Sequence, residues 1–339
     1  MSSTVHATVH APIGLVLSGG GAKGAYQAGV WKAMVETGVG EWVAAISGTS
    51  VGAINAAAIA TIRDPDRIRE IWLGKIASVV SPNVKAFSPR ELLDALGRWT
   101  DGEQFPLRGI LDRDRVEAIL AEELPREWPT GSPAVHATAL EARGASGGEW
   151  DRSSYARTRF RIDREADPDR RRRQLLASCA IPWCYSPVEI GGKRYVDGGW
   201  NAMGGENTPV EPLLRNHPDI RTVVVVRCNS RDLDPEPLRV PRPKGLRVLE
   251  IRPTKPLPGI FTPGLAGGAF LASTIFPAFG GPLGSLLLAA FSGTRTAKVW
   301  GATLAFSPSF ASQFFDAGHR DALDALASIV PPSGHQKRS

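Results

Sequence analysis

The chain has 339 residues, and its content of 42% hydrophobic and 22% charged residues is typical of a globular protein and excludes a globally disordered one. A formal net charge of +6 is only mildly basic, and three cysteines without a Cys-x-x-Cys pair argue against a disulfide framework and against a zinc site. The N-terminal residues lack the basic and apolar segments of a secretory signal, so we expect a cytoplasmic protein.

The N-terminal part of the chain alternates short apolar runs with stretches of small residues. Residues 13–17 predict a buried strand and 22–36 a helix, and 42–46 and 53–60 repeat the pair. Because strand and helix alternate, this order predicts a parallel sheet covered by helices.

The rest of the chain predicts further elements of both kinds. Helices are expected over 64–76, 112–123, 167–177 and 310–329, and strands over 134–140, 148–152, 188–190, 194–196, 222–226 and 246–251. The strands at 188–190 and 194–196 are expected to form a hairpin closed by Gly191 and Gly192.

Residues 256–294 contain no charged side chain. Their number would suffice for a membrane span, which needs about 20 apolar residues. Pro258, Pro263, Pro277 and Pro282 interrupt the segment, so two short apolar helices are expected instead. These helices would pack on the core as a cap or lie on a bilayer surface, and both alternatives are open.

Arginines are concentrated between residues 152 and 173. The cluster consists of Arg152, Arg157, Arg159, Arg161, Arg164, Arg170, Arg171, Arg172 and Arg173. No aromatic residues interleave with the run 170–173 in a stacking pattern, so nucleic-acid binding is not expected. The cluster is either a solvated surface or a patch for anionic lipid, which would place the protein peripherally at the inner face of a membrane.

A glycine-rich loop follows the first predicted strand. The spacing Gly19-x-Gly21-x-x-Gly24 fits the dinucleotide fingerprint, but no acidic residue ends the second strand to hold a ribose. It is not a P-loop either, because Gly24 and not Ser or Thr follows Lys23. The alternative is a loop whose amides approach a developing oxyanion.

The second strand ends in Gly48-Thr-Ser50-Val-Gly52. Gly-x-Ser-x-Gly between a strand and a helix is typical of a nucleophile elbow, in which the tight turn needs the two glycines. The serine would lie at the positive end of the next helix, which favours a nearby oxyanion. The alternative is a glycine-flanked packing turn.

Asp197-Gly198-Gly199 follows the predicted hairpin. It is either a simple turn or a turn that presents the base that a serine nucleophile needs. A Ser–Asp–His order would need a histidine after Asp197, and His217 and His319 lie in no glycine-marked loop. The spacing therefore leaves both a Ser–Asp dyad and a triad open.

Together these motifs resemble the pattern of the patatin-like phospholipases. The family pattern is Gly-Gly-Gly-x-Arg/Lys-Gly, then Gly-x-Ser-x-Gly, an Ala-Ser-x-Ala-x-Pro block, and Asp-Gly-Gly/Ala. This chain has the four in that order at residues 19–24, 48–52, 177–182 and 197–199. The resemblance covers roughly residues 12–227.

The resemblance implies a three-layer α/β/α fold around a central, mostly parallel sheet. It implies a dyad without histidine in which Ser50 is the acylated nucleophile and Asp197 the general base, with neither a metal nor a cofactor. Lys23 would orient the oxyanion loop. The implied oxyanion loop is Gly19, Gly20, Gly21, Ala22, Lys23 and Gly24, and the implied glycine turns are Gly48 and Gly52 around the nucleophile and Gly198 and Gly199 after the base.

Three features depart from the family pattern. The loop after Asp197 is longer than usual, so that Asn207 and Pro209 are displaced along the chain. The family's Ala-Thr-Asp/Asn-Leu strand has Ala139 in its polar third position. The apolar segment 256–294 matches no family motif. These departures leave the residues of the dyad intact.

The resemblance also predicts the organisation and the activity. Residues 12–227 are expected to form a patatin-like catalytic core and 228–330 an extension that completes the domain, whereas 1–11 and 331–339 are expected to be flexible. The implied activity is hydrolysis of carboxylic esters in lipids, of the phospholipase A or lysophospholipase kind. An acyltransferase or thioesterase with the same dyad is the alternative, and a membrane-associated binding protein with a vestigial site is a third.

Overall fold

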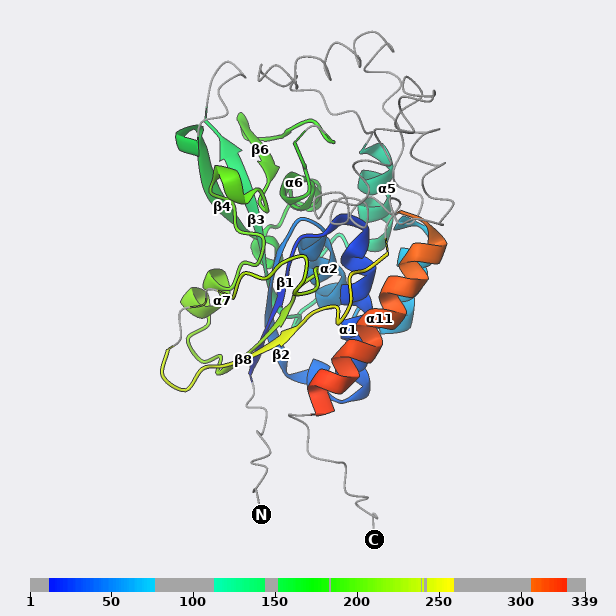
Figure 1. Cartoon of the computed structure of the whole chain (residues 1–339). Helices are drawn as coiled ribbons and strands as arrows, with labels where there is room; N and C mark the ends of the chain where they lie inside the picture. The colour runs from blue at the N-terminus through cyan, green and yellow to red at the C-terminus, as the bar shows by residue number, and fades with distance from the viewer. Residues whose placement is uncertain are drawn as a thin grey trace, which may run out of the picture.

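The computed structural model describes residues 12–76, 113–143, 152–182, 184–238, 240, 243–258 and 306–327. The predicted flexible ends and nearly all of the apolar segment 256–294 lie outside these residues. The described part of the chain forms one eight-stranded sheet with helices against both of its faces (Figure 1). The predicted α/β/α fold with a central, mostly parallel sheet is confirmed.

The strands run in the order β5-β6-β3-β2-β1-β7-β8, and β4 also pairs with β3. β1, β2, β3, β7 and β8 are parallel neighbours, and β4, β5 and β6 are antiparallel. Their bounds are β1 (Ile13–Leu17), β2 (Val43–Thr49), β3 (Ala134–Ala142), β4 (Tyr155–Arg161), β5 (Val188–Ile190), β6 (Lys193–Asp197), β7 (Thr222–Val226) and β8 (Arg247–Ile251).

Helices and short 3₁₀ turns connect these strands. The α-helices are α1 (Gly24–Glu36), α2 (Val51–Thr61), α3 (Pro65–Gly74), α5 (Asp114–Glu123), α6 (Pro168–Ser178), α7 (Glu211–Asn216) and α11 (Pro308–Ala327). The 3₁₀ turns are η1 (Gly21–Lys23), η2 (Val39–Trp42), η4 (Arg152–Ser154), η5 (Ile162–Arg164) and η6 (Asn201–Met203). None of the helices that the structure describes combines the length and the apolar character needed to cross a bilayer.

One predicted strand differs in place. The strand expected over 148–152 lies mostly outside the described residues, and its last residue, Arg152, belongs to the 3₁₀ turn η4. The strand in this region is β4, which reads Tyr-Ala-Arg-Thr-Arg-Phe-Arg. Arginines occupy alternate positions of β4, so the sequence lacks the alternation of apolar and polar residues by which a strand is usually predicted. The strand accommodates these arginines because acidic residues pair with them.

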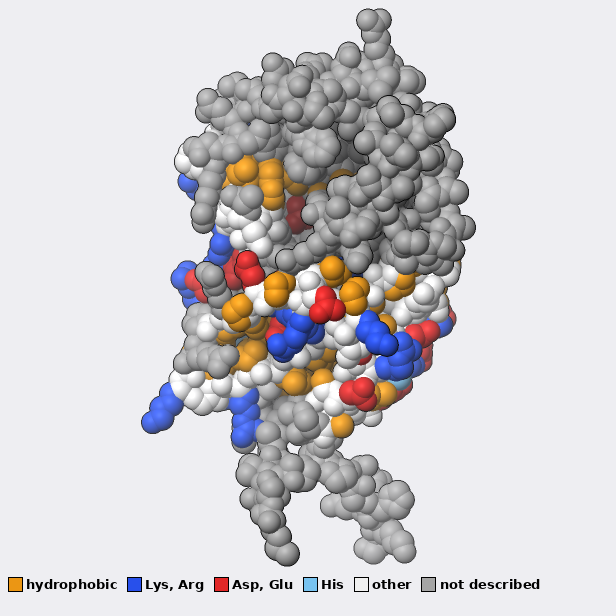
Figure 2. Space-filling view, viewed as in Figure 1, with side chains coloured by type: hydrophobic (Ala, Val, Ile, Leu, Met, Phe, Trp, Pro, Cys, Tyr) orange, Lys and Arg blue, Asp and Glu red, His pale blue; other side chains and the backbone are white. Residues whose placement is uncertain are grey.

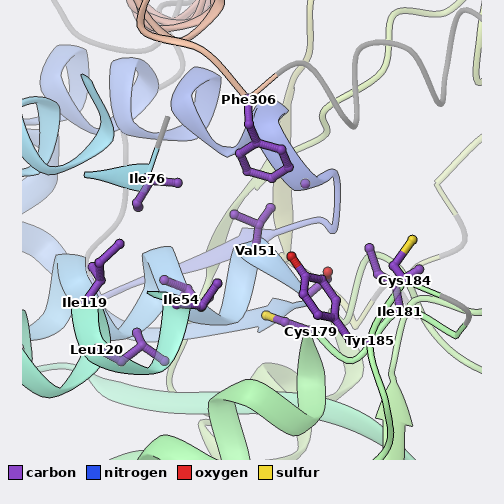
Figure 3. A pocket seen from close by; sticks show the side chains of 13 residues that line it. Val51, Ile54, Ile76, Ile119, Leu120, Cys179, Ile181, Cys184, Tyr185 and Phe306 are labelled. Atoms are coloured by element: carbon purple, nitrogen blue, oxygen red, sulfur yellow. The ribbon is translucent and has the colours of Figure 1, made fainter. Parts of the chain in front are cut away.

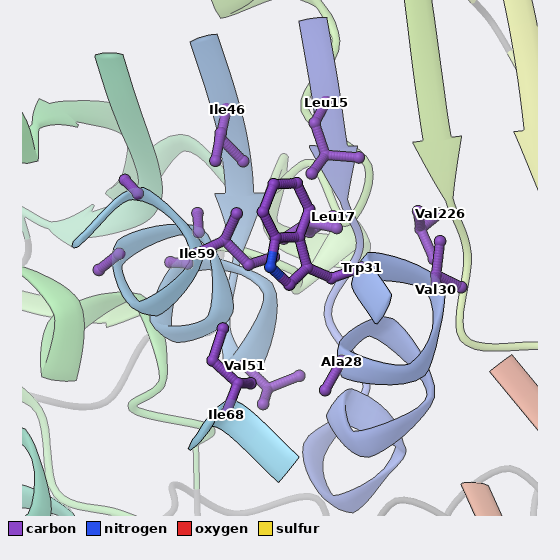
Figure 4. Close-up of a cluster of buried hydrophobic side chains, with 14 of the residues drawn as sticks. Leu15, Leu17, Ala28, Val30, Trp31, Ile46, Val51, Ile59, Ile68 and Val226 are labelled. Carbon is purple, nitrogen blue, oxygen red and sulfur yellow. The ribbon is translucent and has the colours of Figure 1, made fainter. Parts of the chain in front are cut away.

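The main core lies between the sheet and the helices α1, α2, α3 and α11. Trp31 of α1 is 2% exposed and packs with Leu15, Leu17 and Ile46 of the central strands (Figure 4). A smaller cluster on the opposite face joins Val223 and Val225 of β7 to Leu213 of α7. β1 and β7 are therefore apolar on both faces, as expected for central parallel strands.

α1 and α11 approach each other through two glycines. A Cβ on Gly29 would lie 1.9 Å from the carbonyl oxygen of Phe315, and one on Gly318 would lie 2.0 Å from that of Tyr26. The Tyr26 hydroxyl donates to Asp321 Oδ2 at 3.0 Å across the same contact. Backbone contact of this kind fixes α11 against the N-terminal helix.

β3 brings two distant parts of the chain together. Thr49, at the end of β2, pairs with Thr138, and Asp197, at the end of β6, pairs with the next residue, Ala139. β4 pairs with both Thr138 and Ala139 from the other side of the strand. β2 and β6 therefore share one edge of β3, and their last residues lie side by side.

Candidate active site

Ser50 lies at a strained turn between β2 and α2. Its φ of 56° is in the left-handed region, which residues other than glycine rarely adopt. A Cβ on Gly48 would lie 2.2 Å from the carbonyl oxygen of Gly52, and one on Gly52 would lie 2.2 Å from that of Leu17. Only glycine fits at either position, so the turn has the geometry of a nucleophile elbow.

Asp197 is buried beside this turn. Its amide donates to the Ala180 carbonyl at 2.9 Å, and its Oδ1 accepts the Gly199 amide at 2.7 Å. Its Oδ2 is buried and has no hydrogen-bond partner of ordinary geometry among the described residues. A Cβ on Gly198 would lie 2.2 Å from the Thr138 carbonyl oxygen, so the turn after Asp197 presses directly on β3.

The electrostatics of Asp197 suit a base. Burial raises its pKa to about 6, while the Ser50 hydroxyl and the Gly199 amide act in the opposite direction. A carboxyl whose pKa lies just below neutrality is ionised at pH 7 and still binds a proton readily.

The histidines that follow Asp197 have other neighbours. His217 Nε2 lies 3.0 Å from His136 Nε2, and His319 Nε2 lies 2.6 Å from Glu36 Oε2. Burial lowers the pKa of both imidazoles, that of His136 to about 4, so His136 is neutral near pH 7. His335 lies outside the described residues. The dyad, and not the triad, is therefore the arrangement that the described residues favour.

The backbone of the glycine loop divides into engaged and open amides. The Gly19 amide donates to the Asn207 carbonyl at 3.1 Å, and the Lys23 amide donates to the Gly20 carbonyl at 3.2 Å. The Gly24 amide donates to the carbonyls of Gly21 and Ala22. The amides of Gly20, Gly21 and Ala22 have no backbone acceptor among the described residues. Of the six residues predicted for the oxyanion loop, these three are therefore the candidates whose amides could bind an oxyanion.

The side chain of Lys23, in the glycine loop, is buried and hydrogen-bonded. Its side chain is 2% exposed, and its Nζ donates to Asn229 Oδ1 at 2.7 Å. Burial lowers the pKa of Lys23 to about 8, and Cys228 and Asp234 act in the opposite direction. The role of Lys23 in orienting the loop stays a prediction.

Ser50 lies where two cavities of different character meet. One is apolar and is lined by Val51, Ile54, Ile76, Ile119, Leu120, Cys179, Ile181, Cys184, Tyr185 and Phe306, together with Gly21, Ser50 and Val116 (Figure 3). The other, called the polar cavity, has the polar side chains of Lys23, Asn201, Asn207 and Asn229 in its lining, together with the dyad, the glycine loop and the less polar Ile181, Pro182 and Trp200. Burial raises the pKa of the Cys184 thiol to about 12 and that of Cys179 well above its usual value, so both thiols are neutral.

Ser178 is a site residue whose role the sequence did not reveal. Its Oγ accepts the Ser50 amide at 2.9 Å and donates to the Thr138 carbonyl at 2.6 Å. It thereby ties the nucleophile turn to β3. The signal for it was the Ala-Ser-Cys-Ala-Ile-Pro block at 177–182, whose second residue is this serine.

Replacing Ser178 with alanine should lower the free energy of unfolding by about 1–3 kcal/mol, because the buried Ser50 amide would lose its acceptor. Denaturant unfolding measures the change. Ser47→Ala is the matched control, since the Ser47 hydroxyl is equally buried but has no hydrogen-bond partner among the described residues. Equal losses in the two variants would contradict the assigned role of Ser178.

Asn207 reaches the site although it is displaced along the chain. The loop after Asp197 contains η6 and closes on itself, because the Glu206 amide donates to the Gly198 carbonyl at 2.7 Å. The extra residues are therefore accommodated in this loop, and Asn207 lines the polar cavity.

Five of the nine arginines in the cluster pair with acidic residues in the described part of the chain. Arg157 and Arg159 contact Glu206, Arg161 contacts Asp163, and Arg170 contacts Glu165. Acidic and basic side chains are also intermixed on the described part of the face in Figure 2. This pairing favours a solvated surface over a patch for anionic lipid. Within the described ranges, no three His, Cys, Asp or Glu side chains converge so that they could hold a metal ion.

Comparison with known proteins defines the family. A family model described as patatin-like phospholipase matches residues 15–214, which is more than half of the chain. The chain therefore belongs to the patatin-like phospholipase family, and this membership supports lipid hydrolysis as its activity. No curated protein matches the chain.

Two solved structures have detectable but low similarity. VipD from Legionella pneumophila is 14% identical with a TM-score of 0.42, over 84% of this chain and 68% of that one. Human GIVD cytosolic phospholipase A2, in complex with the inhibitor methyl gamma-linolenyl fluorophosphonate, is 13% identical with a TM-score of 0.42. That match covers 94% of this chain and 59% of the human one. Similarity at this level bears on neither substrate nor mechanism.

Proposed function

We propose that the protein hydrolyses carboxylic esters of lipids through an acyl intermediate on Ser50, with Asp197 as the general base. The observation that carries this proposal is the position of Ser50. It lies on a strained elbow, beside a buried Asp197 oxygen that has no hydrogen-bond partner of ordinary geometry among the described residues, and between the apolar and the polar cavity. A lipid ester also has an apolar part, the long acyl chain, and a polar part, the alcohol, which match the two cavities.

In the first half of the reaction, the Asp197 carboxylate takes the proton of the Ser50 hydroxyl as its oxygen attacks the ester carbonyl carbon. The carbonyl oxygen becomes an oxyanion, which the amides of Gly20, Gly21 and Ala22 stabilise by donating hydrogen bonds. The ester bond then breaks, and Asp197 returns the proton to the departing alcohol.

In the second half, water replaces the alcohol. Asp197 takes one proton from the water as its oxygen attacks the acyl carbon, and the same amides hold the second oxyanion. The acyl–Ser50 bond breaks, Asp197 returns the proton to the Ser50 oxygen, and the free carboxylic acid leaves. Every step uses side chains and amides of this chain.

The acyl chain is assigned to the apolar cavity. Leucine, isoleucine and phenylalanine side chains line it, and burying each methylene of an acyl chain there contributes roughly 0.8 kcal/mol. The polar cavity, with three asparagines and Lys23, is assigned to the alcohol part of the ester. Peripheral contact with a membrane through 256–294 stays a prediction.

Trapping of the acyl intermediate tests the proposal. The protein is mixed with a short-chain nitrophenyl ester, quenched in acid within the first turnover and digested. The peptide that contains Ser50 should gain the mass of one acyl group, and the released product should be the free acid. The variant Ser50→Ala is the control and should gain no label.

Three results would redirect the assignment. Acylation at another residue, or full turnover by Ser50→Ala, would remove Ser50 as the nucleophile. A new ester in place of the free acid, when an alcohol is added, would make the protein an acyltransferase. Incubation of a mixed lipid extract with wild type and Ser50→Ala, read by mass spectrometry, then identifies the lipid class that is consumed.

A further inference from the structure

A two-residue segment, Glu206–Asn207, makes hydrogen bonds to all three parts of the site. The Thr49 hydroxyl, next to the nucleophile, donates to the Glu206 carbonyl at 2.8 Å. The Glu206 amide donates to the carbonyl of Gly198, next to the base, at 2.7 Å. The Asn207 carbonyl accepts the amide of Gly19, at the start of the glycine loop, at 3.1 Å. This segment therefore links nucleophile, base and oxyanion loop.

The side chain of Asn207 completes the junction. Its Oδ1 lies 2.4 Å from where a Cβ on Gly19 would be and 2.6 Å from where a Cβ on Gly199 would be. The glycine loop and the turn after Asp197 thus both close around one amide group. A small movement of this segment would displace both.

Arg157 of β4 holds the segment from outside. Its Nη2 and Nε donate to the Gly204 carbonyl at 2.7 and 3.1 Å, and its Nη1 donates to Glu206 Oε2 at 3.1 Å. Arg159 Nη2 contacts the same carboxylate oxygen at 3.0 Å. A forked guanidinium can bind a carboxylate and a carbonyl at once, which a lysine ammonium at this position would do less well. The Arg157 side chain is only 35% exposed.

We propose that Arg157 is a positioning residue, which holds Glu206–Asn207 against the glycine loop and the Asp197 turn and so keeps the base aligned with Ser50. The proposal rests on the proposed function for its kinetic consequence, whereas the contacts themselves do not. Arg157 touches no part of the substrate site, because it does not line either cavity at Ser50. It acts through Gly204 and Glu206.

The kinetic effect should fall on kcat. Arg157→Gln should lower kcat about tenfold and leave KM within about twofold, because misalignment of a catalytic group costs rate while the cavity linings stay in place. Loosening of the loop should also let water reach Asp197. The groups that act on the Asp197 carboxyl are the Ser50 hydroxyl, the thiols of Cys179 and Cys184 and the Gly199 amide, none of which is charged near pH 7. Lys23 is a charged side chain that lines the same cavity, and its ammonium group is held by Asn229. The acidic limb of the kcat/KM profile should therefore move to lower pH than in wild type.

The test compares Arg157→Gln, Arg157→Lys and Arg170→Gln. Arg157→Lys should recover part of the rate, since it keeps the charge beside Glu206 but not the fork. Arg170→Gln is the matched control, because Arg170 also forms one ion pair on the surface, with Glu165, and has no contact with the loop. Arg170→Gln should leave kcat and the pH profile unchanged.

Amide hydrogen exchange gives a readout that does not depend on turnover. Exchange at Gly19 and Glu206 should be faster in Arg157→Gln than in wild type and unchanged in Arg170→Gln. Unchanged exchange and kcat in Arg157→Gln would overturn the proposal, as would a tenfold loss of kcat in Arg170→Gln. A wild type without Ser50-dependent turnover would refute the proposed function, and the exchange comparison would still decide whether Arg157 holds the segment.

Discussion

Replacing Asp197 with asparagine should lower kcat for ester hydrolysis by about a thousandfold, within the range that a positioned general base contributes. The asparagine keeps the shape and can still accept the Gly199 amide, but it cannot take the Ser50 proton.

For the wild type, kcat/KM should rise as the pH increases through about 6, because the base works only when it is ionised and burial raises its pKa to about 6. The measurement is steady-state turnover of a nitrophenyl ester from pH 4 to 9.

The same substitution should stabilise the fold above pH 6. The folded-state pKa of Asp197, about 6, lies above the ordinary aspartate value of 3.8, so the folded protein binds this proton more tightly than the unfolded chain. In the wild type, this tighter proton binding by Asp197 stabilises the fold fully below about pH 4, and the stabilisation is lost as the pH rises through about 6. Asparagine carries no charge and avoids this loss. A shift of two pKa units corresponds to roughly 3 kcal/mol, which is the upper limit of the gain at pH 8.

Asp169→Asn is the control for both effects. Asp169 lies in the first turn of α6 with its side chain 65% exposed, and it should change neither turnover nor the pH profile. Loss of activity without any gain in stability would mean that the Asp197 charge is better solvated than its burial implies. Retention of activity in Asp197→Asn would exclude it as the base.

Replacing Gly29 with alanine should lower the free energy of unfolding by about 3 kcal/mol or more. The added methyl group would lie 1.9 Å from the Phe315 carbonyl oxygen, and neither backbone can move without separating α1 from α11. Phe310, Phe314 and Phe315 of α11 would lose part of their burial as the helices separate. Denaturant unfolding with the midpoint and slope fitted separately measures the loss.

Gly74→Ala provides the matched control. Gly74 ends α3, and a Cβ there would have nothing within 4 Å. Alanine should therefore stabilise the protein by up to about 1 kcal/mol through its better helix propensity. If Gly29→Ala were as stable as Gly74→Ala, the close approach of α1 and α11 would not exist in solution.

Much of the fold could be predicted because its strands have simple patterns. The apolar runs of β1 and β7 direct side chains into the core on both faces of the parallel sheet, and the small residues of α2 pack against one face. The observed bounds of β1 and β7 are those predicted. β4 was missed because arginines alternate along it, and the acidic partners of Arg157 and Arg159 lie about 50 positions away in the chain. The short helix α7 was missed because its six residues are too few to show periodicity.

The candidate site divides in the same way. The glycines around Ser50 and after Asp197 could be predicted because tight backbone turns demand them at fixed positions. The roles of Ser178 and Arg157 could not, because each depends on strand register. Ser178 matters only because its hydroxyl joins the Ser50 amide to the Thr138 carbonyl of β3, and Arg157 only because β4 lies against the loop that follows Asp197. No local pattern encodes either contact.

The shared edge of β3 has a consequence for how this architecture can diversify. Thr49, the residue before Ser50, and Asp197 pair with adjacent residues of β3, so the spacing between Ser50 and Asp197 does not depend on the length of the loops in the chain that joins β2 to β6. Insertions and deletions in that connection, which cost little in loop entropy, can therefore reshape the entrance for new substrates without moving the dyad. An added residue inside β3 at Thr138 would separate the two anchoring positions. We therefore expect insertions and deletions to be tolerated in the loops of the connection and hardly at all within β3.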